Sequence, residues 1–429
     1  MTRVYAAFVG CKVSQADSEA AAAKLAAAGC RVVASRDEAD LCVLLSCCVT
    51  AEAERKSRQM ARRLAADGRR VVVGGCAAAL RPEQFREPGV EVLGGRSWVG
   101  AALAQPVAAA EQRSATLPAA AEERSATLPT AAADAPTGAL RRRTRLMLKV
   151  QDGCAQRCAY CAVRLARGPL WSLPLEEAVA AARRGLADGC GEIVLTGVNL
   201  GAYRDDDGAE LTDLASRLVA LPELARLRLS SIEPLHLTPL LLSTLAHPKV
   251  ARHLHVPLQS ADDDVLAAMR RPYSFAEYAA TLERARRELP GVMITTDVIV
   301  GYPTEDEPAF ARTLAAIEPG GGLLSRVHVF GYSQRPGTEA AGLAPLPAVT
   351  MKRRLTAALA AADATRRAAR RSVLGAPAEV VVEERRDGLW RGYSSQYVRY
   401  YLWGAAAPGR LVRACADEEF KDGVKGRII

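Results

Sequence analysis

The chain has 429 residues, so two or three domains are expected rather than one. Because 49% of the residues are hydrophobic and 24% are charged, with no apolar stretch long enough to cross a bilayer, the composition excludes a wholly disordered chain and a membrane-spanning helix. The formal net charge of +9 suits a polyanionic partner such as nucleic acid, and the polar N-terminal residues are not typical of a signal peptide, so we expect a cytoplasmic protein with no membrane partner.

Residues 1–104 alternate short β-type runs with helical segments. Helices are predicted from Ser14, where Ser14-x-x-Asp17 resembles a capping box, and from the residue after Thr50. Strands are predicted at 4–9, 40–46 and 69–75. Strands that alternate with helices in this way indicate a parallel sheet with helices on its faces, so the first domain is predicted to be α/β.

Residues 105–138 interrupt this alternation. They contain a tandem eleven-residue repeat, EQRSATLPAAA followed by EERSATLPTAA, without apolar periodicity. We therefore predict a disordered, low-complexity linker. An eleven-residue period is also typical of a right-handed coiled coil, but the Leu-Pro in each repeat disfavours a helix.

Residues 139–374 return to alternating strands and helices. Six strands are predicted, at 145–151, 192–198, 226–232, 253–259, 292–301 and 325–332. A complete eight-stranded barrel needs about 250 residues, so an open (β/α)6 barrel is the better prediction. A long basic helix, predicted at 349–374, closes this region.

Residues 375–429 consist of short β-type runs with Gly-rich breaks. This pattern predicts a small all-β barrel of the OB-like kind that binds oligonucleotides. Its aromatic residues are candidates for stacking on bases, and packing in the β core is the alternative. They are Trp390, Tyr393, Tyr397, Tyr400, Tyr401 and Trp403.

Three cysteines follow the first predicted strand of the open barrel, in the segment DGCAQRCAYCAVRLARG. Cys154, Cys158 and Cys161 have the spacing C-x3-C-x2-C, with Tyr160 immediately before the third. Cysteine thiolates at close spacing hold iron–sulfur clusters, and three of them leave one iron of a [4Fe–4S] cluster open to chelation by S-adenosylmethionine (SAM). The alternative is a zinc site, but zinc wants a fourth Cys or His, and the five histidines lie far downstream.

A second set of three cysteines lies in the first domain. Cys11, Cys47 and Cys76 each follow directly after a predicted strand. Because the carboxyl ends of parallel strands open onto one crevice, these thiols are expected to converge and to suit a second cluster. The alternative is that they are small core residues. Cys48, next to Cys47, leaves the identity of that ligand open on the pattern alone.

Motifs in the same order along nearly the whole chain resemble those of the radical-SAM methylthiotransferases. Among these enzymes the chain looks most like the MtaB type, which modifies N6-threonylcarbamoyladenosine in tRNA. The motifs are GCKVSQADSE, SCCVTAEAERKSRQ, VVVGGCAA, LKVQDGCAQRCAYCAVRLARG, EIVLTGVNLGAY, RLSSIEP, HLHVPLQS, TTDVIVGYP and VFGYSQRPGT. The chain departs from the family's usual residues at Ser14, Leu45–Ser46, Leu170–Trp171 and Thr304.

This resemblance implies three domains around the linker at 105–138. They are an N-terminal methylthiotransferase domain (1–104), a radical-SAM partial barrel with its terminal basic helix (139–374) and a C-terminal TRAM domain (375–429). The resemblance also implies that Cys11, Cys47 and Cys76 hold an auxiliary [4Fe–4S] cluster, with Cys47 rather than Cys48 as the ligand.

Polar residues near the catalytic ends of the barrel strands, together with the aromatic residue of the cysteine loop, are candidate contacts for SAM. A capping or supporting polar role is the alternative for each of them. They are Tyr160, Thr196, Gly197, Asn199, Ser231, Glu233, Gln259 and Asp297.

The implied reaction converts N6-threonylcarbamoyladenosine at position 37 of tRNA to its 2-methylthio derivative. A 5′-deoxyadenosyl radical from SAM removes hydrogen from C2 of the base, sulfur comes from the auxiliary cluster, and a second SAM gives the methyl group. The implied partners are a tRNA anticodon stem-loop and an electron donor of the flavodoxin or ferredoxin type, while the sulfur donor is unknown.

Two rival substrates and one rival class of protein remain open. Related enzymes methylthiolate isopentenyladenosine in tRNA or a side chain of a ribosomal protein. The basic, aromatic C-terminal module favours RNA over protein. The rival class is a non-catalytic iron–sulfur or zinc protein that binds RNA.

Overall fold

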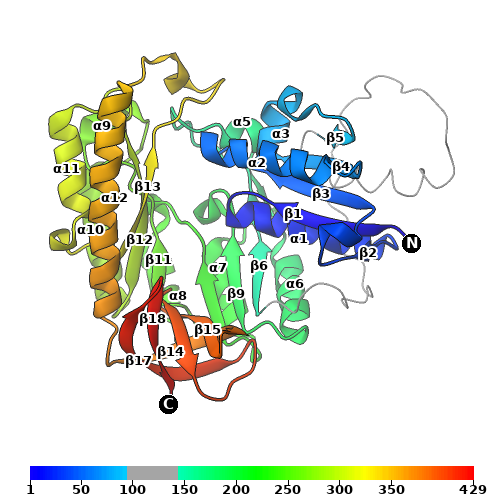
Figure 1. The fold of residues 1–429 in the computed structure, drawn as a ribbon. Coiled ribbons are helices and arrows are strands. Elements are labelled where there is room, and N and C mark those ends of the chain that lie inside the picture. The colour runs from blue at the N-terminus through cyan, green and yellow to red at the C-terminus, as the bar shows by residue number, and fades with distance from the viewer. Residues whose placement is uncertain (94–143) are drawn as a thin grey trace. The chain divides into compact units, whose positions relative to one another are not determined.

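The computed structural model describes residues 1–93 and 144–429, so the predicted linker at 105–138 lies outside the described residues (Figure 1). The chain divides into two compact units. The first comprises Met1–Arg141 with Ala162–Gly168, and the second comprises Arg142–Cys161 with Pro169–Ile429. Among the described residues, we find no helix that combines the length and apolar character of a membrane span.

The first unit is built on a five-stranded parallel sheet, in the order β2-β1-β3-β4-β5. Its core strands carry the predicted β-type runs, and the two outer strands are too short to have been recognised in the sequence. The strands are β1 (Arg3–Phe8), β2 (Arg31–Val32), β3 (Leu41–Ser46), β4 (Arg70–Gly75) and β5 (Val90–Val92). The parallel α/β prediction for this region is confirmed.

The helices of this unit begin just after the strands. They are α1 (Lys12–Ala27), α2 (Ala51–Ala65), α3 (Cys76–Leu80) and α5 (Val163–Arg167), with 3-10 turns η1 (Arg36–Glu38) and η2 (Pro82–Phe85). Thr50 is the N-cap of α2, and its hydroxyl accepts a hydrogen bond from the Ala53 amide at 3.0 Å. The predicted capping box at Ser14 is wrong, because α1 begins two residues earlier with Cys11 at its N-cap.

The second unit contains six parallel strands in two groups of three, with order β6-β9-β10 and β11-β12-β13. Isolated bridges from Leu227 to Val250 and from Ser231 to His255 connect the groups, which confirms the open (β/α)6 barrel. The strands are β6 (Arg145–Lys149), β9 (Glu192–Thr196), β10 (Arg226–Leu229), β11 (His253–His255), β12 (Met293–Val300) and β13 (Arg326–Gly331).

Helices cover the outer face of these strands. Alternate strand residues such as Leu254, Ile294 and Val298 are buried in one hydrophobic core with them, so the intervening residues point to the inner face of the barrel. The long basic helix α12 packs along β13 (Figure 1). The helices are α6 (Leu175–Ala187), α7 (Leu211–Val219), α8 (Pro239–Leu245), α9 (Asp263–Ala268), α10 (Phe275–Glu288), α11 (Glu307–Ile317) and α12 (Ala348–Arg371).

Short elements complete the connections in this unit. Strands β7 (Gln151–Asp152) and β8 (Trp171–Ser172) pair antiparallel, with Trp171 opposite Asp152. The unusual segment around Leu170–Trp171 therefore pairs with the strand that leads into the cysteine loop. The 3-10 turns are η3 (Leu200–Ala202), η4 (Pro234–His236), η5 (Pro319–Gly321) and η6 (Glu339–Gly342).

The C-terminal residues form the predicted small all-β barrel, which is closed and has the strand order β14-β15-β16-β18-β17. Arg228 of the open barrel attaches it. Arg228 and Glu192 of the neighbouring strand are both fully buried, and their side chains pair at 2.8 Å. Arg228 also donates to the backbone carbonyls of Ser394 and Ser395, at 3.0 and 3.1 Å. The strands are β14 (Pro377–Arg386), β15 (Leu389–Ser394), β16 (Arg399–Trp403), β17 (Leu411–Phe420) and β18 (Gly423–Ile428).

Candidate active site

The cysteine loop of the second unit follows β7 and is held in place by its backbone. The amide of Ala159 donates to the carbonyl of Met269 at 3.0 Å, and the carbonyl of Ala159 accepts from the amide of Ala340 at 2.8 Å. Cys154, Cys158 and Cys161 are each half-buried. Burial raises the pKa of the Cys154 thiol, so a thiolate at this position needs a nearby cation.

One such cation is Arg271, which the sequence motifs did not identify. Its Nη1 donates to Sγ of Cys158 at 3.2 Å, and its Nη2 pairs with the carboxylate of Glu233. Burial opposes the charge of this guanidinium, but the neighbouring acidic groups, Tyr160 and Glu233 first among them, raise its pKa above the usual value. Arg271 thus links Glu233, a candidate SAM contact, to the cysteine loop, which itself contains the candidate Tyr160.

Gln151 ties the cysteine loop to the end of β9. Its fully buried side chain donates from Nε2 to the carbonyls of Asp152 and Gly153, at 2.7 and 2.9 Å, and its Oε1 accepts from the Asn199 amide at 2.7 Å. A Cβ atom at Gly197 would lie only 2.9 Å from that Oε1, which explains the glycine. The position of Gln151 directly before the cysteine loop was the only feature of the sequence that pointed to this residue.

The same arrangement leaves a polar atom available to a ligand. Oδ1 of Asn199 is buried and has no hydrogen-bond partner among the described residues. A buried amide oxygen without a partner is costly, and a cofactor that donates a hydrogen bond would remove that cost. Asn199 and Gly197 are therefore the candidate SAM contacts whose surroundings best fit a bound group.

The remaining candidates lie in different surroundings. Thr196 is fully buried and its hydroxyl donates to the carbonyl of Val194 at 3.3 Å. Ser231 is paired in register with His255, and Gln259 has a left-handed backbone, with φ of 71°. Asp297 does not join the residues around Arg271, because its carboxylate lies between His255 and His328.

The first unit brings together Cys11, Cys47 and Cys76 beyond the ends of β1, β3 and β4. Gly10 has φ of 120°, and a Cβ atom there would lie 2.6 Å from Sγ of Cys47. Burial, together with the neighbouring thiols Cys11 and Cys76, raises the pKa of Cys47 to about 12. Three thiols within electrostatic reach of one another form a donor set that fits a metal cluster.

Arg167 supplies positive charge to this second set. Its Nε donates to Sγ of Cys76 at 3.1 Å, and its Nη2 pairs with Oδ2 of Asp17 at 2.8 Å, with both side chains about nine-tenths buried. A hydrogen bond from Cys48 lowers the pKa of Cys76 in spite of burial, and Arg167 lowers it further. The sequence motifs did not single out Arg167, which lies 91 residues from Cys76 along the chain.

Two of the unusual residues support this site. The Ser46 hydroxyl donates to the carbonyl of Gly74 at 2.6 Å and accepts from the amide of Ala78 at 2.9 Å. It thus joins the end of β3 to β4 and to the helix that begins at Cys76. The Ser14 hydroxyl lies 3.6 Å from Sγ of Cys11, so it faces the cysteine at the N-cap of α1 and does not itself cap the helix.

Comparison with known proteins finds a family match for each of the two cysteine-bearing regions. Residues 148–317 match the radical SAM superfamily, and residues 3–94 match the uncharacterized protein family UPF0004. The threonylcarbamoyladenosine tRNA methylthiotransferase MtaB of Thermotoga maritima is 32% identical over 406 residues, which cover 92% of this chain and 90% of that protein. The chain belongs to the radical-SAM methylthiotransferase family. As a radical-SAM methylthiotransferase it is an enzyme that uses SAM and a [4Fe–4S] cluster.

Relatives from two branches of the family are similarly close. A probable threonylcarbamoyladenosine tRNA methylthiotransferase of Pyrococcus horikoshii is 32% identical and covers 82% of this chain and 82% of that protein. The tRNA-2-methylthio-N(6)-dimethylallyladenosine synthase of Novosphingobium aromaticivorans is 34% identical and covers 98% of this chain and 96% of that protein. Identity alone therefore does not separate the two substrates.

Solved structures agree with the radical-SAM fold. The radical SAM methyltransferase TsrM of Kitasatospora setae superposes with a TM-score of 0.56 at 17% identity, over 80% of this chain and 75% of that chain. The radical SAM enzyme OxsB superposes with a TM-score of 0.52 at 11% identity, over 79% of this chain and 54% of that chain. At these identities the likeness concerns the fold alone.

Proposed function

We propose that this methylthiotransferase converts N6-threonylcarbamoyladenosine at position 37 of tRNA to its 2-methylthio derivative. The observation that carries the proposal is the second set of thiols, Cys11, Cys47 and Cys76, with Arg167 bonded to one of them. A single radical cluster accounts for hydrogen removal, whereas insertion of sulfur needs a second centre. The names of the relatives in Thermotoga maritima and Pyrococcus horikoshii support the threonylcarbamoyl substrate.

In this proposal Cys154, Cys158 and Cys161 hold the radical-SAM cluster. When bound, the cluster and SAM supply the 5′-deoxyadenosyl radical that removes hydrogen from C2 of the adenine. Arg271 neutralises negative charge at Cys158, and Gln151 fixes the loop relative to Asn199. The proposed SAM contacts are Tyr160, Thr196, Gly197, Asn199, Ser231, Glu233 and Gln259, while Asp297 is assigned a different role below.

An auxiliary [4Fe–4S] cluster would be held by Cys11, Cys47 and Cys76 and would supply the sulfur to be transferred. Arg167 stabilises the Cys76 thiolate in this arrangement, because a charged hydrogen bond to sulfur favours the anion. The buried Asp17 in turn orients the guanidinium of Arg167.

The proposed RNA partner is a tRNA anticodon stem-loop, whose unstacked bases can be read individually. Of the six aromatic candidates in the C-terminal barrel, Trp403 is the one with an exposed large surface, 49% of the residue, and the Nζ atom of Lys425 lies 4.4 Å from its ring centroid. Tyr400 and Tyr401 are buried, and Tyr393 and Tyr397 lie against Arg145 and Arg228. Trp403 and Lys425 are therefore the proposed stacking and phosphate contacts.

A second candidate substrate is isopentenyladenosine at the same tRNA position. It is favoured by the relative in Novosphingobium aromaticivorans, which matches this chain at 34% identity over 98% of its length. Nucleoside mass spectrometry of tRNA from cells with and without the gene separates the candidates. Loss of 2-methylthio-N6-threonylcarbamoyladenosine alone supports the proposal, and loss of the isopentenyl product instead contradicts it.

Two cysteine variants test the roles of the two cysteine sets. Cys158→Ala is expected to abolish formation of 5′-deoxyadenosine from SAM. Cys47→Ala is expected to retain SAM cleavage and to lose sulfur insertion.

After anaerobic reconstitution, about eight irons per chain are expected from two four-iron clusters. One zinc and no iron would instead favour a non-catalytic RNA-binding protein. The electron donor is expected to be of the flavodoxin or ferredoxin type.

A further inference from the structure

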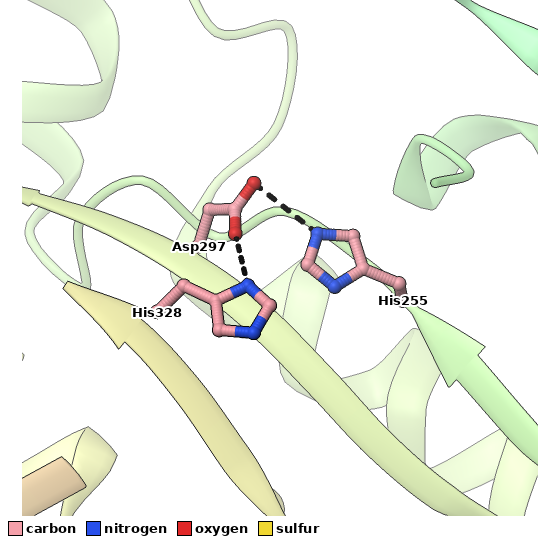
Figure 2. Close-up of side chains that lie close together, drawn as sticks. All are labelled: His255, Asp297 and His328. Atoms are coloured by element: carbon pink, nitrogen blue, oxygen red, sulfur yellow. Dashed lines mark hydrogen bonds and ion pairs between the residues drawn. The ribbon is translucent and has the colours of Figure 1, made fainter. Parts of the chain in front are cut away.

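Three side chains from neighbouring strands converge on the inner face of the open barrel (Figure 2). Oδ2 of Asp297 lies 3.2 Å from Nε2 of His255, and Oδ1 lies 3.1 Å from Nδ1 of His328. Asp297 on β12 is directly opposite His328 on β13 in the parallel register, and His255 comes from β11. Strand register thus determines the spacing of the three groups.

The contacts of Thr295 allow the tautomer of His255 that a metal site needs. The Thr295 hydroxyl lies 2.8 Å from Nδ1 of His255, 3.0 Å from Nε2 of His253 and 3.4 Å from the carbonyl of Leu254. When Nδ1 of His255 donates its hydrogen to this hydroxyl, Nε2 of the neutral ring has a lone pair directed at Asp297, and two acceptors at this distance attract a cation between them.

The Asp297 carboxylate lies between the two imidazoles. Its Oδ2 faces Nε2 of His255 and its Oδ1 faces Nδ1 of His328. A carboxylate between two imidazoles is the ligand combination of many zinc and iron(II) sites.

We propose that Nε2 of His255, the Asp297 carboxylate and Nδ1 of His328 bind a divalent transition-metal ion such as zinc. The three ligand atoms all lie within 4.8 Å of one another. Ligands about 2.1 Å from a shared ion are roughly 3.0–3.5 Å apart. The contacts of Asp297, 3.2 Å through Oδ2 and 3.1 Å through Oδ1, lie in this range, and a bound ion would draw the three ligand atoms closer together. This assignment gives Asp297 a role different from the SAM contact expected from the sequence.

The surroundings also suit a metal site with open positions. The bond from His255 to Thr295 is the outer support that metal-binding imidazoles usually have. The side chains of Asp297 and His328 are 26% and 39% exposed, so an ion can enter and keep positions for further ligands. Three protein ligands with open positions are typical of a metal that also binds water or substrate.

The open coordination positions of the metal suit an oxygen ligand. The place of the site in the barrel suggests that this ligand belongs to the substrate. His255 is paired in register with Ser231, a proposed SAM contact, so the metal site and the cofactor lie on the same face of adjacent strands. The threonylcarbamoyl group of the proposed substrate ends in a carboxylate. The metal is then the anchor for that carboxylate, an extension that rests on the proposed function.

Zinc K-edge X-ray absorption of the reconstituted holoenzyme, after addition of one equivalent of zinc, tests the site without interference from iron. We expect bound zinc with nitrogen and oxygen ligands at about 2.0–2.1 Å and an imidazole signature. Zinc in a vacant cluster site would instead show sulfur at about 2.3 Å. Sulfur ligation, or no retained zinc, overturns the proposal even if every variant fails to fold.

Variants then assign the ligands. Asp297→Asn and His328→Phe are expected to weaken zinc binding at least about tenfold with unchanged iron content, whereas His247→Gln, at an exposed histidine, leaves zinc binding unchanged. Equal zinc affinity in all three variants contradicts the assignment.

Binding of anticodon stem-loop RNA tests the proposed anchor. Zinc is expected to tighten binding of RNA that carries threonylcarbamoyladenosine and to leave RNA with unmodified adenosine unaffected. If zinc binds and the two RNAs respond equally, the anchor is wrong and the metal site stands. If zinc binds but the tRNA product lacks the threonylcarbamoyl group, the proposed function fails and the metal site again stands.

Discussion

Arg167 donates a hydrogen bond from Nε to Sγ of Cys76 at 3.1 Å, and the same guanidinium holds the carboxylate of Asp17 at 2.8 Å. Arg271 makes the equivalent contact with Cys158 at 3.2 Å and with Glu233. Each cysteine set therefore has one buried arginine that bridges a thiol and a carboxylate. An arginine in this position stabilises a thiolate without adding net charge to the protein interior.

Replacing Arg167 by Gln is expected to lower the reduction potential of the proposed auxiliary cluster. A hydrogen bond from a charged donor contributes about 1.5–3 kcal/mol, which corresponds to a shift of roughly 65–130 mV for a one-electron couple. Redox titration followed by electron paramagnetic resonance measures the shift. Arg164→Gln, on the exposed side of the same helix, is the matched control. A potential equal to that of the control would show that Arg167 does not act on the cluster.

Replacing Arg228 by Met is expected to destabilise the attachment of the C-terminal barrel by at most about 3–5 kcal/mol, because the buried carboxylate of Glu192 loses its closest partner and keeps the longer, 3.6 Å contact with Arg226. The double variant Arg228→Met with Glu192→Met should recover much of this loss. Urea unfolding, followed by the fluorescence of Trp390 and Trp403, measures the free energy of unfolding of both variants. Arg217→Met, which breaks an exposed ion pair, should change little. Equal effects of Arg228→Met and Arg217→Met would contradict the prediction.

Replacing Gly197 by Ala is expected to weaken SAM binding by roughly tenfold or more, because the added methyl group meets the side chain of Gln151 and overpacking costs about 1–3 kcal/mol. Equilibrium dialysis of SAM against the reconstituted enzyme measures the change. Gly342→Ala serves as control, since a Cβ atom there meets nothing within 4 Å. Unchanged SAM affinity in Gly197→Ala would show that the turn at Gly197 is not part of the SAM-binding site.

Replacing Trp403 by Ala is expected to weaken tRNA binding by roughly five- to a hundredfold, because one stacked base contributes about 1–3 kcal/mol. The exposed position of Trp403 means that the fold should tolerate the change. Filter binding at a fixed salt concentration measures the affinity, and Trp403→Phe should retain most of it. If Trp403→Ala binds tRNA as tightly as the unchanged enzyme, the RNA-binding face lies elsewhere.

The order of strands and the cysteine sets were predictable because both depend on local pattern. Each strand of the open barrel is a short apolar run, and Cys11, Cys47 and Cys76 directly follow three such runs. The start of helix α1 was misjudged for a local reason as well. The Ser14 side chain faces Cys11, and the helix begins where Gly10 turns the chain.

The arginines and Gln151 were not predictable in this way. Arg271 lies 113 residues from Cys158, and Arg167 lies 91 residues from Cys76. Their contacts depend on how distant segments pack, and a single sequence carries no record of that packing. The cluster of His255, Asp297 and His328 was missed for the same reason, because its members belong to three separate strands.

The attachment of the C-terminal barrel has a consequence for how this protein family can change. Arg226 and Arg228 bind the barrel through backbone carbonyls, including those of Glu379, Tyr393, Ser394 and Ser395. A carbonyl oxygen is present whatever the side chain, so these bonds tolerate sequence drift on the barrel side. The outer surface of the barrel can therefore diverge in sequence and acquire new RNA preferences, while the two arginines keep the same hydrogen bonds to its backbone.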